Sequence, residues 1–184
     1  MGDRAPHALL VFALLAPWCS CGSTTYDHGV PNLSRVTEGV WRSGQPVDWR
    51  YLRDVLRVDH VLKLNNEESE APDDPPPGIV VHRVPIFPTT SVVAVVASLG
   101  LTEVVLPSTE KRAEIQRILL TARREHWVLL VHCQNGWDRT GVVSGVALVL
   151  LDGWSKEAAW QYMLRTGFHR AHLGLDWWWA GFNN

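Results

Sequence analysis

The chain has 184 residues, a hydrophobic fraction of 46% and a net charge of −2 from 17 basic and 19 acidic residues. This length and composition are typical of one globular domain with a sizeable core. The sequence has no long run of either charge, which excludes a general nucleic-acid-binding protein but leaves a small anionic substrate open. We find neither an internal repeat nor a second domain.

The first 25 residues are typical of an export signal. A basic residue precedes the apolar segment ALLVFALLA, which is too short to span a bilayer, and small polar residues follow it. Cys19 and Cys21 stand where a lipoprotein carries its lipidated cysteine, although Trp18 occupies a position that usually holds a small or aliphatic residue. We predict a leader over 1–25 and a folded domain over 26–184, in a protein that is exported and either periplasmic or membrane-anchored as a lipoprotein. The alternative is an apolar leader with no targeting role.

The first half of the domain predicts strands around one short helix. Three segments have the composition of strands, the last two separated by an acidic, proline-rich loop: 39–46, 60–66 and 79–86. Asp48 can cap a helix over 49–57, with Leu52, Val55 and Leu56 on its buried face.

The second half predicts helices that alternate with a buried strand. The apolar segment 89–107 fits a helix or a strand equally well. A helix follows from Ser108, with four apolar residues at helical spacing: Ile115, Ile118, Leu119 and Ala122. The continuous apolar run 127–132 predicts a strand of a parallel sheet. Two helices follow, over 141–151 and from Ser155 to Thr166, and the tryptophans at 177–179 are expected to close the core. This alternation predicts an α/β sandwich with a mainly parallel sheet.

The stretch VLLVHCQNGWDRTG (128–141) contains the residues with the clearest chemistry. Cys133 follows the buried strand, and Arg139 comes six residues later, where a helix begins. Ligands of α/β sheets bind where strands end and helices begin. The residues between Cys133 and Arg139 can form a loop whose backbone N–H groups converge on an anion, and the helix N-terminus favours a phosphate. Gly136 permits the tight backbone, and the guanidinium of Arg139 can bind two phosphoryl oxygens.

The same surroundings are expected to activate Cys133. A helix N-terminus and a nearby guanidinium favour thiolate over thiol, so the sulfur should be ionised near neutral pH. His132 can support this environment, and Thr140 can donate its hydroxyl to the sulfur. Cys133 is the only cysteine of 26–184, so that it is either buried and inert or kept for its reactivity. The pattern predicts covalent phosphoryl transfer through a cysteinyl-phosphate.

The stretch HCQNGWDRTG resembles the HCxxGxxRT signature of the protein tyrosine and dual-specificity phosphatase superfamily. Five residues match it: His132, Cys133, Gly136, Arg139 and Thr140. The order and spacing of VWRSGQP, HVLKLNN, HRVPI and GWSKEAAWQYMLRTGF are similar to those of bacterial dual-specificity-type phosphatases, so the resemblance covers about 39–168. It implies a cysteine-phosphatase fold, with Cys133 as the nucleophile and Arg139 as the phosphate clamp. The residues expected to bind substrate are His132, Gln134, Asn135, Gly136, Trp137 and Thr140.

The general acid is where the chain departs from this family. Its enzymes protonate the leaving oxygen with an aspartate on the loop after the strand that corresponds to HRVPI, and here FPT stands in that place. Asp138 is the leading candidate, because GWDRT resembles the spelling of the motif in myotubularin phosphoinositide phosphatases, whose acid is thought to be the loop aspartate. Glu103 is the other candidate. Asp138 can instead orient Arg139 or a neighbouring loop.

The expected substrate is a phosphorylated protein, or a small phosphorylated molecule. A phenolic leaving group depends less on a strong acid than an alkyl alcohol does, which favours phosphotyrosine. The alternatives are an inositol-phosphate or phosphoinositide phosphatase and a phosphate-binding pseudophosphatase without turnover. No cofactor or metal is expected, since there is no CxxC pair and His169 with His172 is a weak ligand set. Several basic residues can line a rim around the site: Arg42, Lys63, His82, Arg83, Arg165, His169 and Arg170.

Overall fold

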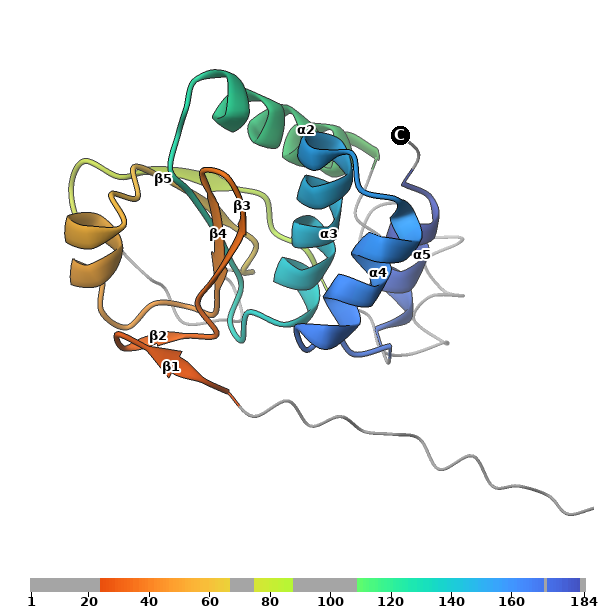
Figure 1. Ribbon diagram of the computed structural model, residues 1–184, viewed down its shortest axis with the longest axis horizontal. Helices are drawn as coiled ribbons and strands as arrows, with labels where there is room; N and C mark the ends of the chain where they lie inside the picture. Colours follow the sequence, from red (N-terminus) through yellow and green to blue (C-terminus); the bar gives the residue numbers. More distant parts are fainter. Residues whose placement is uncertain (1–23, 67–74, 88–108, 171, 183–184) are drawn as a thin grey trace, which may run out of the picture.

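A five-stranded sheet forms the centre of the molecule (Figure 1). The computed structural model describes residues 24–66, 75–87, 109–170 and 172–182. In spatial order the strands are β3 (Ser34–Thr37), β4 (Val40–Ser43), β7 (Leu129–His132), β5 (His60–Lys63) and β6 (Val80–Arg83). Strands β4, β7, β5 and β6 run parallel, and β3 pairs with the edge of β4 antiparallel. The predicted mainly parallel sheet is thereby confirmed, although its strands are shorter than the apolar segments that predicted them.

A small hairpin precedes the sheet and was not predicted. Strands β1 (Tyr26–Asp27) and β2 (Val30–Pro31) pair antiparallel. Their two-residue turn, His28 and Gly29, has φ of 50° and 78°, which is the left-handed backbone that tight hairpins require. Strands of two residues are too short to show an alternating pattern, so the sequence carries little signal for them.

The helices lie on both faces of the sheet (Figure 1). Helices α2 (Thr109–Arg124), α3 (Asp138–Asp152), α4 (Lys156–Arg165) and α5 (Leu173–Ala180) gather on one side. The single-turn π-helix η1 (Tyr51–Val55) lies on the other. Helix α3 is buried along most of its length, which explains its uninterrupted apolar sequence.

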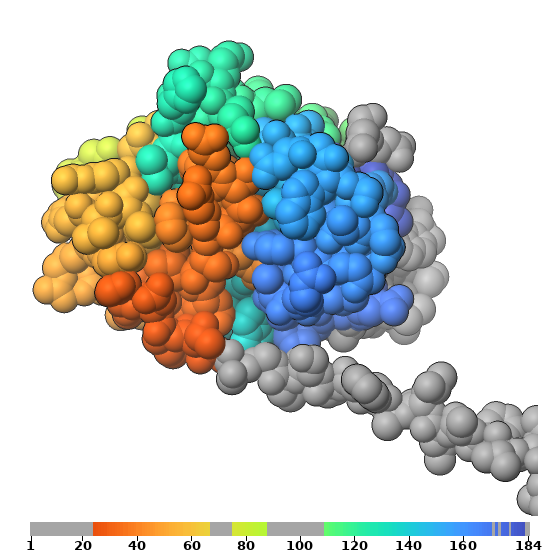
Figure 2. All heavy atoms as spheres, viewed as in Figure 1, coloured from red at the N-terminus to blue at the C-terminus, as the bar shows by residue number. Residues whose placement is uncertain are grey.

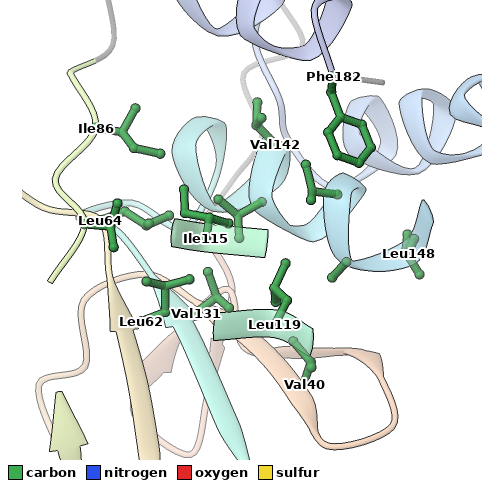
Figure 3. Packing of buried hydrophobic residues seen from close by; sticks show 14 of the residues in the cluster. Val40, Leu62, Leu64, Ile86, Ile115, Leu119, Val131, Val142, Leu148 and Phe182 are labelled. Atoms are coloured by element: carbon green, nitrogen blue, oxygen red, sulfur yellow. The ribbon is translucent and has the colours of Figure 1, made fainter. Parts of the chain in front are cut away.

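Alternating side chains of the central strands divide the core into two parts. Leu62 and Val131 pack toward the four α-helices, as Figure 3 shows. Val61 and Leu130, one residue away on the same strands, pack with Leu52 of η1. The two central strands are therefore buried on both faces, as the continuous apolar runs predicted.

Most predicted helix features are confirmed. The four apolar residues predicted for the buried face of α2 are all buried. The hydroxyl of Ser155 accepts a hydrogen bond from the Ala158 amide and so caps α4 as expected. Trp178 and Trp179 are buried in the core. Helix α3 begins at Asp138, three residues before the predicted start at Gly141.

The prediction for the helix over 49–57 was wrong in its geometry. The amide of Leu56 donates to the carbonyl of Tyr51 at 3.1 Å, a five-residue step that winds the chain as a π-helix. The wider turn leaves Leu52 buried but places Val55 outside, with 60% of its surface exposed. Asp48 accepts a hydrogen bond from the Arg50 amide at 2.9 Å instead of capping a regular helix.

Two predictions concern residues that are not described. The segment 89–107 and Glu103 within it lie outside the described residues, as does nearly all of the leader over 1–25. Within the described ranges, no helix has both the length and the apolar character that crossing a bilayer would require.

Candidate active site

The candidate site is the loop of residues 133–139, here called the signature loop. It joins the end of β7 to the start of α3, at the carboxyl edge of the parallel sheet (Figure 1). Cys133 directly follows β7 and is only 2% exposed, and Arg139 lies in the first turn of α3. The structure thus brings the thiol and the guanidinium to the strand–helix junction where the sequence placed them.

Gly136 allows the signature loop to close tightly. Its φ is 77°, in the left-handed region that favours glycine. A Cβ at this position would stand 2.3 Å from the nitrogen of Gly44, so no side chain fits there. The amide of Gly136 donates to Sγ of Cys133 at 3.3 Å, which stabilises negative charge on the sulfur.

Three successive carbonyls of the signature loop are held from outside by the N-terminal part of the chain. The backbone amide of Gln45 donates to Gln134 O at 3.0 Å. The side-chain amide of Asn32 donates to Asn135 O at 2.7 Å. The guanidinium of Arg42 donates to the next carbonyl, that of Gly136. In a trans peptide the N–H points opposite to the C=O, so these bonds turn the three following amides toward the interior of the loop.

Arg42 is a buried part of the site that supports the signature loop from outside. The sequence allowed Arg42 and Lys63 to line a basic rim, but their side chains are buried, with only 1% and 2% of their surface exposed. Besides Gly136 O, the Arg42 guanidinium binds the hydroxyl and the carbonyl of Thr166 at the end of α4. Burial lowers the pKa of Arg42 below its ordinary value. Figure 2 shows the N-terminal strands beside α4 on this face, the arrangement that Arg42 bridges.

Arg139 reaches across the ends of two other strands. It is 8% exposed, and its Nη1 lies 3.4 Å from Leu64 O and 3.5 Å from Ile86 O. These carbonyls follow β5 and β6, so the guanidinium is oriented by the sheet edge. A rigid fork held in this way can bind a phosphoryl group with little loss of entropy.

The remaining residues predicted to bind substrate differ in exposure. His132 is fully buried, and its ring meets that of Trp49 edge-on, with 6.3 Å between the centroids. Thr140 is also buried, and its hydroxyl has no hydrogen-bond partner within the described part of the chain, so the expected bond to the sulfur is not formed here. Gln134 and Asn135 are exposed and contribute the backbone carbonyls described above.

Trp137 lies on the flank of the signature loop. Its ring meets that of His169 edge-on, with 5.2 Å between the centroids, and borders Gly167. It also lines an open cavity of about 250 Å³, together with Arg165 and Thr166. The indole therefore shapes the surface beside the loop.

The carboxylate of Asp138 is directed toward the segment after α4. Oδ1 accepts hydrogen bonds from the His169 amide at 2.7 Å and from its ring at 3.1 Å, and Oδ2 lies 3.1 Å from Nε2 of His172. Burial raises the pKa of Asp138, but the hydrogen bonds from His172 and from the His169 amide outweigh it, so the pKa lies below its ordinary value. The acid role of Asp138 stays a prediction, and this geometry favours its other proposed role, orienting a neighbouring loop.

No metal centre accompanies this arrangement in the described ranges, where no three histidine, cysteine or acidic side chains are grouped to hold an ion. The two histidines that the sequence offered as a weak ligand set instead converge on Asp138.

Comparison with known proteins places this site in a family. The model of the tyrosine phosphatase family matches residues 38–173. These residues include the entire signature loop and every strand of the five-stranded sheet except β3. The chain therefore belongs to the tyrosine phosphatase family, as the resemblance of its signature motif implied.

Individual relatives agree with this assignment. The dual-specificity protein phosphatase TpbA of Pseudomonas aeruginosa is 41% identical over 54 residues, which are 29% of this chain and 24% of TpbA. The matched stretch thus spans about a quarter of this curated relative.

Solved structures show the same fold over most of the chain. The crystal structure of P. aeruginosa TpbA has a TM-score of 0.59 at 21% identity, covering 87% of this chain and 89% of that one. Tk-PTP in its active form gives 0.58 at 22% identity, over 83% and 99%. PTPMT1, solved in complex with PI(5)P, gives 0.60 at 16% identity, over 80% and 94%. The α/β cysteine-phosphatase fold is confirmed.

Proposed function

We propose that this protein hydrolyses phosphate monoesters, with phosphotyrosine or related aryl phosphates as its preferred substrates, through a cysteinyl-phosphate intermediate. The observation that carries the proposal is the Gly136 amide 3.3 Å from the sulfur of Cys133, inside a loop whose carbonyls are bound from outside. This arrangement stabilises a thiolate and offers N–H donors to phosphoryl oxygens. A TpbA structure in complex with pTyr shows that a protein of this fold holds an aryl phosphate.

The chemistry takes place in two displacements. The Cys133 thiolate forms a bond to phosphorus as the bond to the leaving oxygen breaks, and that oxygen keeps the electron pair and takes a proton from solvent. A water then attacks phosphorus, loses a proton and releases inorganic phosphate, while the electron pair of the S–P bond returns to sulfur. Arg139 and the loop amides neutralise the charge on the phosphoryl oxygens in both steps.

The state of Asp138 supports aryl substrates. Its lowered pKa keeps the carboxylate ionised near neutral pH, and its oxygens are occupied by His169 and His172. A phenol, with a pKa of about 10, leaves without a strong acid, whereas an alkyl alcohol requires protonation. Without a proton from Asp138, aryl esters should therefore be cleaved faster than alkyl esters.

Phosphate release from three substrates tests the proposed function. A phosphotyrosine peptide is expected to be hydrolysed faster than a phosphoserine peptide and an inositol polyphosphate, in metal-free buffer over pH 4–8. Much faster hydrolysis of the inositol polyphosphate would instead identify an inositol-phosphate phosphatase. Binding of the peptide to a folded protein without release of phosphate would identify a phosphate-binding protein that lacks turnover.

The variant Asp138→Asn separates the two roles of this carboxylate. We expect it to slow aryl and alkyl phosphates by a similar factor, because both oxygens of Asp138 already contact the segment of His169 and His172. The measurement is the ratio of kcat/KM for the two ester types in variant and parent. A much larger loss on alkyl phosphates would show that Asp138 is the general acid.

The same variant is expected to change the pH dependence of stability. A carboxylate whose pKa is lowered by folding stabilises the native state above its unfolded pKa, about 4, and this contribution is lost as the pH falls through the folded pKa. The difference in unfolding free energy between parent and Asp138→Asn should therefore shrink on acidification below about pH 4. A constant difference would contradict the ionised, hydrogen-bonded state.

Export, with attachment to a membrane through the leader, is a further part of the proposed function. It is supported by the short apolar segment ahead of Cys19 and Cys21. Mass spectrometry of the protein from membrane and soluble fractions tests it: an intact leader on soluble protein inside the cell would exclude both export and lipid attachment.

A further inference from the structure

Asn32 connects the N-terminal hairpin to the signature loop through both ends of its side-chain amide. Nδ2 donates to Asn135 O at 2.7 Å, 103 residues away in the chain. Oδ1 accepts from the Thr25 amide at 3.0 Å and from the Thr25 hydroxyl at 3.4 Å. A backbone amide can only donate and a backbone carbonyl can only accept, so these partners settle which end of the Asn32 amide faces which.

The carbonyl that Asn32 binds and the amide that binds the sulfur belong to one peptide unit. Asn135 O and Gly136 N are the two polar atoms of the same planar group, and no described peptide bond is cis. With Asn135 O held by Asn32, the Gly136 N–H must point the opposite way, and it donates to Sγ of Cys133 at 3.3 Å. One hydrogen bond therefore sets the direction of the other.

We infer that Asn32 is a positioning residue for Cys133, which holds and polarises the Asn135–Gly136 peptide so that its N–H stabilises the thiolate. A hydrogen bond accepted by a peptide carbonyl strengthens the bond that the N–H of the same peptide donates. The inference rests on the proposed function and deepens it. A residue outside the signature loop would stabilise the thiolate of the nucleophile within it.

Asn32 is better suited to this role than the other two groups that donate hydrogen bonds to the carbonyls of the signature loop. The Gln45 donor is a backbone amide, which no substitution removes. Arg42 is fully buried and also binds Thr166, so its loss would disturb packing as well as the loop. Asn32 is half-buried, with a φ of 51° that asparagine adopts readily. Its amide can therefore be altered with little change elsewhere.

Two substitutions of Asn32 and one control variant test the hydrogen bond that Nδ2 of Asn32 donates to Asn135 O. Asn32→Asp keeps the shape and the acceptor for Thr25 but replaces the donor by a carboxylate oxygen. Asn32→Gly removes the amide without adding charge and suits the positive φ. Thr25→Val removes the hydroxyl donor to Oδ1 but leaves the Asn32–Asn135 bond and the Thr25 amide in place. Thermal unfolding of all three shows that each variant is folded at the assay temperature.

Alkylation of Cys133 by iodoacetamide as a function of pH is the main measurement, because it reports the thiolate directly. Both Asn32 variants are expected to move the pH of half-maximal alkylation upward, and Asn32→Asp is expected to move it further than Asn32→Gly because it also adds negative charge. Thr25→Val should leave it unchanged. On an aryl phosphate, kcat/KM should fall in both Asn32 variants at the pH values where their alkylation profiles show less thiolate than that of the parent.

The outcomes separate this inference from the proposed function. A folded Asn32→Gly with the alkylation profile of the parent would overturn the positioning role. So would a profile that moves only in Asn32→Asp, since added charge alone would explain it. Because alkylation does not require turnover, a shift in both variants of a protein that releases no phosphate would support the positioning role while the proposed function failed.

Discussion

Replacing Cys133 by serine is expected to lower the rate of phosphate release on the order of 1,000-fold or more. The protein should keep its fold and its affinity for inorganic phosphate. The substitution exchanges the buried sulfur for a smaller oxygen that is not ionised near neutral pH, so the S–P bond cannot form. The loop amides and Arg139 remain, and the loss of the thiolate charge removes repulsion toward an anion. Phosphate release and calorimetric titration with inorganic phosphate measure the two effects.

The circular dichroism spectrum of Cys133→Ser, compared with that of the parent, serves as the folding control. Turnover within about tenfold of the parent would contradict a covalent mechanism, because water or another group would then be the nucleophile. Loss of phosphate affinity together with turnover would instead show that the sulfur is needed to shape the signature loop.

Replacing Gly136 by alanine is expected to cost about 2–4 kcal/mol of stability and to remove activity. The new Cβ would stand 2.3 Å from Gly44 N and 2.5 Å from the carbonyl carbon of Ser43, and backbone atoms cannot move aside as a flexible side chain can. The loop would have to shift, which moves the Gly136 amide away from the sulfur of Cys133. Urea unfolding gives the stability, and phosphate release gives the activity.

Gly153 provides the matched control for this substitution. It ends α3 with a φ of 68°, close to the 77° of Gly136, but among the described residues no atom outside its own chain neighbours lies within 4 Å of the Cβ that alanine would add. Gly153→Ala therefore introduces the backbone strain without the collision. It is expected to cost about 1 kcal/mol of stability and to leave activity unchanged. Equal losses of stability in the two variants would show that strain rather than contact makes Gly136 necessary.

Local pattern in the sequence determined the architecture and the core of the site. The uninterrupted apolar run before Cys133 predicts a strand buried on both faces, and the strand is buried in that way. The spacing of Ile115, Ile118 and their neighbours predicts the buried face of α2. The signature motif itself places Cys133, Gly136 and Arg139 at a strand–helix junction, because loop length and glycine position are properties of a short continuous segment.

Only the tertiary structure decided how this loop is held and where Asp138 points. The three donors to its carbonyls come from residues 32–45, about 90 to 100 positions earlier in the chain, and nothing in their spacing marks them as neighbours of the loop. The spelling GWDRT allowed Asp138 to act as an acid or as an anchor, and folding brings His169 and His172 to its oxygens. The physical reason is that a hydrogen bond depends on distance and direction in space, whereas sequence pattern records only periodicity and local conformational preference.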